Sequence, residues 1–126
     1  MLKQFLKKFN FEFSFKSSTE NYKNGTFNES LKKVAEKYED IINIILPTLR
    51  SERRKTYSPF LPLCPESGKV LEIPMINLDK KTGKIIFDNS GKKIETSIYD
   101  GHCKLQWKVD WAMRWFTFDV DFEMYG

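Results

Sequence analysis

The chain has 126 residues, a formal net charge of +4, a pI of about 9.0 and 40% hydrophobic residues. This length fits one domain or part of one, and this hydrophobic content excludes wholesale disorder. Cys64 and Cys103 lie too far apart in sequence for a disulfide framework, so we expect free thiols in a reducing compartment. The longest apolar run, residues 41–47, is too short to cross a bilayer, and no signal-peptide pattern follows the N-terminal lysines. We therefore expect a soluble, cytoplasmic protein with no membrane partner.

The first third of the chain changes its hydrophobic period twice. Apolar residues within 1–9 share one helical face, which predicts a short amphipathic helix. Phenylalanine then occupies every second position from 9 to 15, which predicts a strand with one buried face. Residues 17–25 are polar and include Asn-Gly, which predicts a loop. Thr26 and Glu29 fit a capping box for a helix over residues 27–45, which Pro47 ends.

The middle of the chain is first basic and then rich in strand and turn patterns. The basic residues of 50–55 have two open interpretations, a solvated connection or a contact to a phosphate backbone. Two prolines within 57–63 favour an extended segment. Strand patterns follow at 70–78, where Pro74 indicates an edge or a bulge, and then at 84–87 and 94–98. We predict a three-stranded meander that is too thin to bury much by itself and is inserted in a larger domain.

All three tryptophans lie near the C-terminus, four residues apart, at positions 107, 111 and 115. On a helix they form one ridge, flanked by the charges of Lys108, Asp110 and Arg114. Periodicity alone favours a ridge that faces the core. The alternative is a pocket wall that binds a flat or cationic ligand through stacking and cation–π contacts. Residues 118–123 then alternate between apolar and acidic, which predicts a last strand.

The sequence offers little catalytic or metal-binding chemistry. His102 is the only histidine, and it cannot readily serve as a base for the adjacent Cys103, so we predict no catalytic residue. Residues 64–68 have the spacing of a zinc knuckle, with Ser67 in place of the second cysteine, and the opposing turn at 88–91 has no cysteine. Since structural zinc needs four ligands, we predict a ribbon that keeps the shape of a zinc ribbon and binds no metal.

Three stretches together resemble class I lysyl-tRNA synthetase, also called lysine–tRNA ligase. The strongest is Lys-Leu-Gln-Trp-Lys-Val-Asp-Trp-Ala-Met-Arg-Trp at 104–115, followed by Val-Asp-Phe-Glu-Met-Tyr-Gly at 120–126. The second comprises Leu-Pro-Thr-Leu at 46–49, Glu-Arg-Arg at 52–54, Thr-Tyr-Ser-Pro-Phe-Leu-Pro at 56–62 and Cys-Pro at 64–65. The third is Ser-Thr-Glu-Asn-Tyr at 18–22 with Gly25 and Phe27. They follow the family's order and cover most of the chain.

The resemblance implies an α/β fold, part of a Rossmann-type catalytic domain with an inserted three-stranded β ribbon. Residues 1–58 would end the first half of that domain, 59–103 would form the metal-free ribbon and 104–126 would re-enter the domain. The intact enzyme would use ATP, with magnesium, to form lysyl-adenylate and would pass the lysyl group to tRNA. The His-Ile-Gly-His and Lys-Met-Ser-Lys-Ser types of ATP motif are both absent. We therefore expect an internal fragment that is inactive alone and that self-associates through uncovered apolar faces.

The resemblance also suggests binding residues. A lysine substrate needs an acidic or aromatic partner for its ammonium group, and Trp107, Asp110 and Trp111 suit that role. Three basic residues are expected to contact the tRNA acceptor arm, on whose side the inserted region of class I enzymes lies: Arg53, Arg54 and Lys55. The alternative hypothesis is a free-standing module, derived from such an enzyme, that binds nucleic acid or protein.

Overall fold

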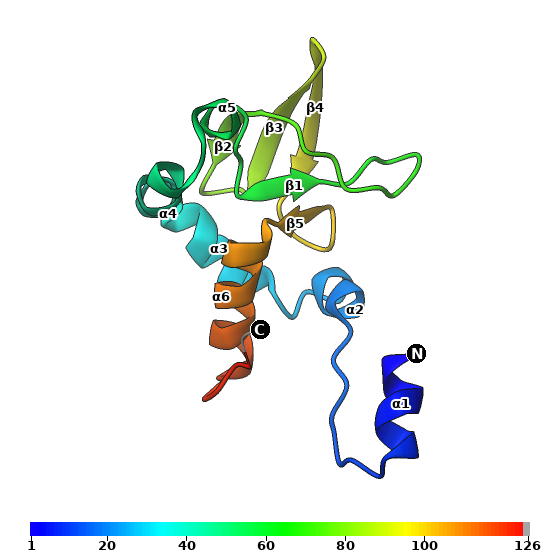
Figure 1. The fold of residues 1–126 in the computed structure, drawn as a ribbon. Helices are drawn as coiled ribbons and strands as arrows, with labels where there is room; N and C mark the ends of the chain where they lie inside the picture. The colour runs from blue at the N-terminus through cyan, green and yellow to red at the C-terminus, as the bar shows by residue number, and fades with distance from the viewer. Residues whose placement is uncertain (125–126) are drawn as a thin grey trace.

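The computed structural model describes residues 1–124, which form a mixture of helices and short antiparallel strands (Figure 1). Strand β1 (Phe60–Pro62) pairs with β5 (Cys103–Leu105), with Phe60 opposite Leu105. Between them in sequence, β2 (Met75–Asp79), β3 (Lys84–Asn89) and β4 (Lys92–Ser97) form a separate sheet in the order β2-β3-β4. This confirms the predicted meander.

Local chemistry explains the geometry of the meander. The register of β2 shifts between Met75 and Asn77, just after Pro74, so a bulge lies close to the predicted position. The turn between β3 and β4 places Ser90 and Gly91 at positive φ, +54° and +87°. Two successive residues of this kind match the twist of an antiparallel hairpin.

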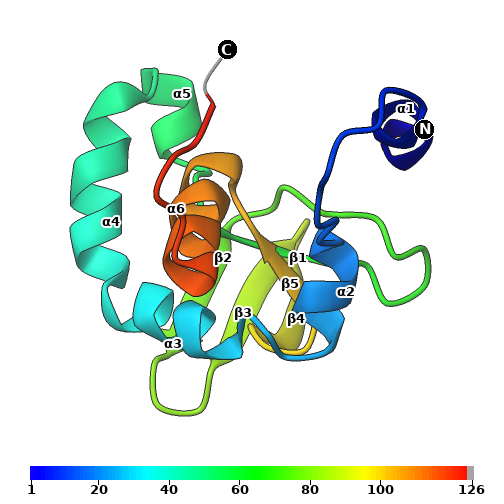
Figure 2. The ribbon, with the colours of Figure 1, turned by 90° about the horizontal axis from the view of Figure 1, so that it is seen from below.

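Most of the helices lie on one side of the strands (Figure 1 and Figure 2). Helices α3 (Asn28–Glu36) and α4 (Tyr38–Ile45) run beside α6 (Trp107–Phe118), and α2 (Ser18–Lys23) lies at the other side of α6. A 3₁₀ turn, η1 (Leu46–Thr48), and the short helix α5 (Ser51–Arg54) lead to β1. Among residues 1–124, no helix has the length and apolar character needed to cross a bilayer.

One core joins the helices to both sheets. Its residues come from α2, α3, α4, α6 and strands β1, β3 and β5, and its largest deeply buried side chains include Tyr22, Phe27, Leu31, Phe60, Ile85, Phe87, Ile98 and Cys103. The ring of Phe27 packs edge-on against Tyr22, with centroids 4.9 Å apart, and against Phe118, at 5.6 Å. Contacts between aromatic rings at these separations stabilise a core beyond the effect of buried area.

The N-terminal helix is confirmed as α1 (Leu2–Lys8), but the strand predicted over residues 9–15 is wrong. Residues 11–17 carry no helix or strand, and the four phenylalanines are exposed. Residues 1–15 stand apart from the rest of the fold (Figure 1). An alternating pattern needs a sheet to pair with, and no strand among the described residues pairs with this segment.

Two further predictions in the first third are wrong. The expected loop at 17–25 contains α2, because the Ser17 side chain accepts a hydrogen bond from the Glu20 N–H (3.4 Å) and Tyr22 is drawn into the core. The expected capping box does not form, because the Thr26 hydroxyl donates instead to Asn24 Oδ1 (2.6 Å).

The single helix predicted over 27–45 is two helices. The chain leaves helical geometry at Lys37, where φ is −95° and ψ is 18°, and α4 ends at Ile45 before the turn that contains Pro47. The last predicted strand is also wrong. Phe118 ends α6, and Asp119 follows in the left-handed conformation with φ of 50°. That conformation ends the helix and turns residues 119–124 away from it.

The core predicts how two phenylalanines differ in mutational cost. Phe60→Ala removes a fully buried ring between the sheets and helices, so we expect the free energy of unfolding to fall by about 3–5 kcal/mol. Phe11→Ala is the matched control, because its ring is exposed, and it should change the free energy of unfolding by less than about 0.5 kcal/mol. Urea unfolding followed by circular dichroism measures both, and equal losses would contradict this core.

Candidate binding surface on helix α6

Helix α6 buries one face and exposes Trp107 and Trp115, while Trp111 between them is half-buried. Val109, Asp110 and Met113 are buried, whereas Trp107 is 55% exposed and Trp115 40% exposed. Positions 107 and 109 differ by roughly 200° around a helix, so the two stripes lie on nearly opposite faces. The interpretation that the ridge faces the core is therefore wrong. The core takes the 109–113 stripe because α6 packs there against α3.

The tryptophan ridge is ordered by contacts between its own rings. The Trp107 and Trp111 rings meet edge to face, with centroids 5.2 Å apart and planes at 79°. Trp111 and Trp115 stack, with centroids 6.1 Å apart and planes at 24°. Lys108 Nζ lies 5.6 Å from the centroid of Trp107, within the range of a cation–π contact. The ridge thus presents aromatic surface of the kind that attracts flat or cationic groups.

A buried hydrogen-bond network fixes how α6 is rotated. The Tyr22 hydroxyl donates to Asp110 Oδ1 (2.5 Å) and accepts from the Leu105 N–H (3.1 Å). The other carboxylate oxygen, Asp110 Oδ2, lies 2.5 Å from Arg114 Nη2. Burial, reinforced by the hydrogen bond to Asp110 and its charge, raises the pKa of Tyr22 well above the ordinary value of a phenol. Tyr22 therefore stays protonated and remains a donor.

This network limits how Asp110 can contact a ligand. Asp110 is only 8% exposed, and both of its oxygens have partners within the protein. Trp107 and Trp111 lie together on the ridge, while the Asp110 side chain is turned to Tyr22 and Arg114. Of the three predicted lysine-binding residues, the structure thus brings two together as a surface and places the third beneath them as part of the support for α6.

The three basic residues predicted to contact tRNA lie at α5 and are exposed. Arg54 Nε donates to the Leu49 carbonyl (2.8 Å), which holds the preceding turn. Arg53 pairs with Glu72 at 3.9 Å, and since both side chains are well exposed this pair is weak. Lys55 follows directly after α5. Arg53 also lines a small cavity of about 50 Å³ together with Trp107, so the two predicted sites meet there.

The knuckle-like turn at 64–68 closes through backbone hydrogen bonds. The Gly68 N–H donates to the Cys64 carbonyl (2.8 Å), and Gly68 has φ of +66°, which favours glycine. Hydrogen bonds from Ser67 lower the pKa of the Cys64 thiol, and the largest contribution comes from the Ser67 side chain. Among the described residues, no group of three or more His, Cys, Asp or Glu side chains is placed to hold a metal ion. Cys103 lies in the core, where burial raises its pKa to about 12.

Comparison with known proteins decides the family. The model of the family "tRNA synthetases class I (K)" matches residues 1–126. The chain belongs to this family. It is 54% identical over 126 residues to the lysine–tRNA ligase of Rickettsia bellii (strain OSU 85-389), and 52% identical to those of Rickettsia africae (strain ESF-5) and Rickettsia felis (strain ATCC VR-1525 / URRWXCal2). Each match covers 99% of this chain and 24% of the relative. The chain thus spans about a quarter of the length of these relatives, and the resemblance seen in the sequence is confirmed.

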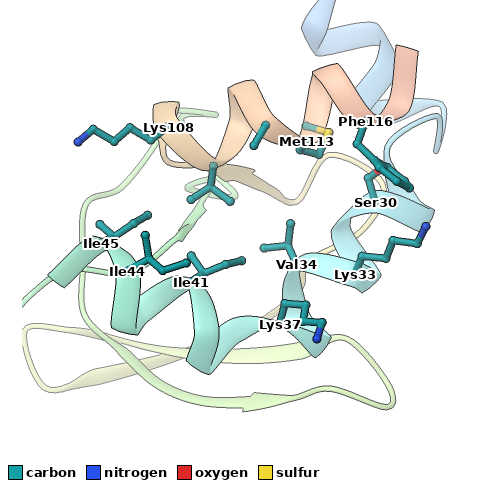
Figure 3. Close-up of a pocket in the computed structure, with 12 residues that line it drawn as sticks. Ser30, Lys33, Val34, Lys37, Ile41, Ile44, Ile45, Lys108, Met113 and Phe116 are labelled. Atoms are coloured by element: carbon teal, nitrogen blue, oxygen red, sulfur yellow. The ribbon is translucent and has the colours of Figure 1, made fainter. Parts of the chain in front are cut away.

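Two features of this class I synthetase chain were not predicted from its sequence. Tyr22 was expected in a loop, although it lies in the Ser-Thr-Glu-Asn-Tyr stretch that carries part of the resemblance, and that stretch was the available signal. An apolar groove between α6 and the α3–α4 pair was not expected at all (Figure 3). It could not be inferred, because the break at Lys37 that sets the angle between α3 and α4 was missed.

The two thiols predict a clear difference in reactivity. Cys64 is partly exposed and has a lowered pKa, whereas Cys103 is fully buried and has a pKa of about 12. Because the thiolate is the nucleophile, iodoacetamide at about pH 8 should alkylate Cys64 in the folded protein and reach Cys103 only after unfolding in urea. Mass spectrometry of peptides reports each site, with Cys64→Ser as the control. Labelling of both thiols at equal rates in the folded state would contradict the burial of Cys103.

Proposed function

We propose that this chain works as part of a lysine–tRNA ligase, which forms lysyl-adenylate from lysine and ATP and transfers the lysyl group to tRNA. The observation that carries the proposal is the ordered tryptophan ridge, with Trp107 and Trp115 exposed and Trp111 half-buried, which lies within the strongest stretch of family resemblance. Chemistry of this type depends on positioning its reactants and stabilising charge. A ligase part therefore needs binding groups in fixed places more than a nucleophile of its own.

We further propose that the chain belongs to a Rossmann-type catalytic domain, with residues 1–58 and 104–126 on either side of a ribbon at 59–103. The pairing of β1 with β5 supports an insertion, because the chain leaves and returns at neighbouring strands. The meander β2-β3-β4 forms its own sheet between these two points in sequence. An insertion of this kind can vary without disturbing the domain that it interrupts.

For lysine, we propose that the ammonium group contacts the faces of Trp107 and Trp111. Each such contact contributes about 0.5–2 kcal/mol, depending on how well the site excludes water. Lys108 already lies within cation–π distance of Trp107, which supports the capacity of this ring to accept an ammonium group. Asp110 serves the same site by holding α6 in place through Tyr22 and by adding negative charge, which Arg114 partly balances.

For tRNA, we propose that Arg53, Arg54 and Lys55 contact phosphates of the acceptor arm. Their exposure on α5 and just after it supports this role, since phosphate contacts need accessible cations. The small cavity that Arg53 shares with Trp107 supports a short path between the tRNA contact and the lysine surface. Binding through these residues should weaken steeply as the salt concentration rises.

The residues of this chain do not fit an ATP site of the class I type. The chain has a single histidine and no Lys-x-Ser-Lys run, and the described residues contain no group of carboxylates suited to magnesium. We therefore assign ATP and magnesium to the longer ligase and derive no step through them here. The competing hypothesis is a free-standing binding module. An open reading frame that encodes His-Ile-Gly-His upstream and Lys-Met-Ser-Lys-Ser downstream would favour the ligase, and stop codons immediately outside both ends would favour the module.

The lysine assignment can be tested in a chimera. We would replace the corresponding stretch of the Rickettsia bellii ligase with this chain and measure lysine-dependent exchange between ATP and pyrophosphate. We expect the chimera to catalyse exchange, the 126-residue chain alone to catalyse none, and Trp111→Ala in the chimera to raise the KM for lysine roughly tenfold with the KM for ATP unchanged. Phe116→Ala is the matched control, since this exposed ring lies on the groove side of α6. Robust exchange by the chain alone would contradict the proposal.

The tRNA assignment uses the same chimera with a different readout. Arg53→Ala combined with Lys55→Ala should raise the KM for tRNA in aminoacylation and leave the exchange reaction unchanged, because exchange needs no tRNA. Lys92→Ala combined with Lys93→Ala removes two exposed lysines from the ribbon and is the control. An equal loss in both reactions would show that α5 supports the fold instead of binding tRNA.

A further inference from the structure

The groove between α6 and the α3–α4 pair is an open and largely apolar surface. It has a volume of about 450 Å³, and the side chains of Val34, Ile41, Ile45 and Met113 form its floor (Figure 3). Val109 also lines it. Ile44 and Phe116, at its edges, are exposed. Contiguous apolar surface of this kind marks a place where another segment binds.

The rim of the groove is positively charged. Lys33, Lys37 and Lys108 line it, and no carboxylate does so among the described residues. Lys33 pairs with Glu29 at 3.8 Å and Lys37 with Asp40 at 3.5 Å, but all four side chains are well exposed and such pairs are weak. Lys33 Nζ also lies 3.9 Å from the centroid of the Phe116 ring and Lys108 Nζ 5.6 Å from that of Trp107, contacts that leave the positive charge at the rim. The segment that fits here is therefore apolar with flanking carboxylates.

Residues 119–124 of this chain have that composition. Val120, Phe122 and Met124 alternate with Asp119, Asp121 and Glu123. Asp119 is in the left-handed conformation, and beyond it an extended chain places Val120, Phe122 and Met124 on one face and Asp121 and Glu123 on the other. Phe122 and Met124 are each 81% exposed, so this segment does not occupy the groove of its own copy. Each copy of the chain therefore offers both an open groove and an uncovered segment that complements it.

We propose that residues 119–124 of one copy bind in the groove of a second copy. Val120, Phe122 and Met124 fill the apolar floor, and the carboxylates approach the three rim lysines. The segment continues directly from the end of α6 (Figure 1), while another face of α6 lines the groove. Both elements thus meet at one helix, and two copies can exchange segments about a twofold axis. The proposal stands on the groove and the segment, independently of the ligase assignment.

A charge-swap experiment tests this pairing. The groove variant carries Lys37→Glu and Lys108→Glu, and the segment variant carries Asp121→Lys and Glu123→Lys; Asp119 is left unchanged because its positive φ disfavours lysine. Sedimentation velocity over a concentration series should show a reversible dimer for the wild type. Each variant alone should dimerise at least tenfold more weakly, because like charges then face each other. An equimolar mixture should restore the dimer, since both interfaces of the mixed pair are complementary.

Two controls keep the outcome decisive. Lys92→Glu with Lys93→Glu makes the same charge change on the ribbon and should leave dimerisation unchanged, and circular dichroism checks that every variant is folded. Association through the exposed phenylalanines of residues 9–15 would persist in both charge variants. That persistence, a monomeric wild type at all concentrations, or failure of the mixture to dimerise would each overturn the proposal.

Discussion

The hydrogen bond between the Tyr22 hydroxyl and Asp110 is the interaction on which the arrangement of this chain depends. It joins residues 88 apart in sequence, and the same hydroxyl accepts the Leu105 N–H, so one phenol connects α2, β5 and α6. A buried carboxylate is costly unless its oxygens are satisfied, and Tyr22 and Arg114 satisfy both. Only one rotation of α6 meets this condition.

That rotation determines what each face of α6 does. With Asp110 turned inward, Val109 and Met113 enter the core, and the tryptophan ridge lies away from it, with Trp107 and Trp115 exposed and Trp111 half-buried between them. The flank toward α3 and α4 lines the apolar groove. The buried contact between Tyr22 and Asp110 thus places the tryptophan ridge, which suits a cation, on one face of α6 and the apolar groove on another.

Local sequence patterns correctly predicted the elements whose structure depends on nearby residues. They failed for elements whose structure depends on contacts with residues far away in the sequence. The meander and α1 follow from turn residues and amphipathic spacing, and both are confirmed. Residues 17–25 were misjudged because α2 depends on the burial of Tyr22 against β5 and α6, which spacing does not reveal. The tryptophan period of four identified a stripe on α6, but only the buried charge at Asp110 shows which stripe faces the core. The family was identified from the resemblance of three stretches to class I lysyl-tRNA synthetase, and composition alone could not have identified it.

A double-mutant cycle between Tyr22 and Asp110 tests the central claim most directly. Tyr22→Phe and Asp110→Asn are each made alone and together, and urea unfolding gives the free energy of unfolding of all four proteins. If the hydroxyl and the carboxylate act as one buried unit, each single change should cost about 1–3 kcal/mol, and the double change should cost less than the two added together by at least about 1 kcal/mol. Costs that add within about 0.3 kcal/mol would show that the two groups are independent and would contradict this account of how α6 is held.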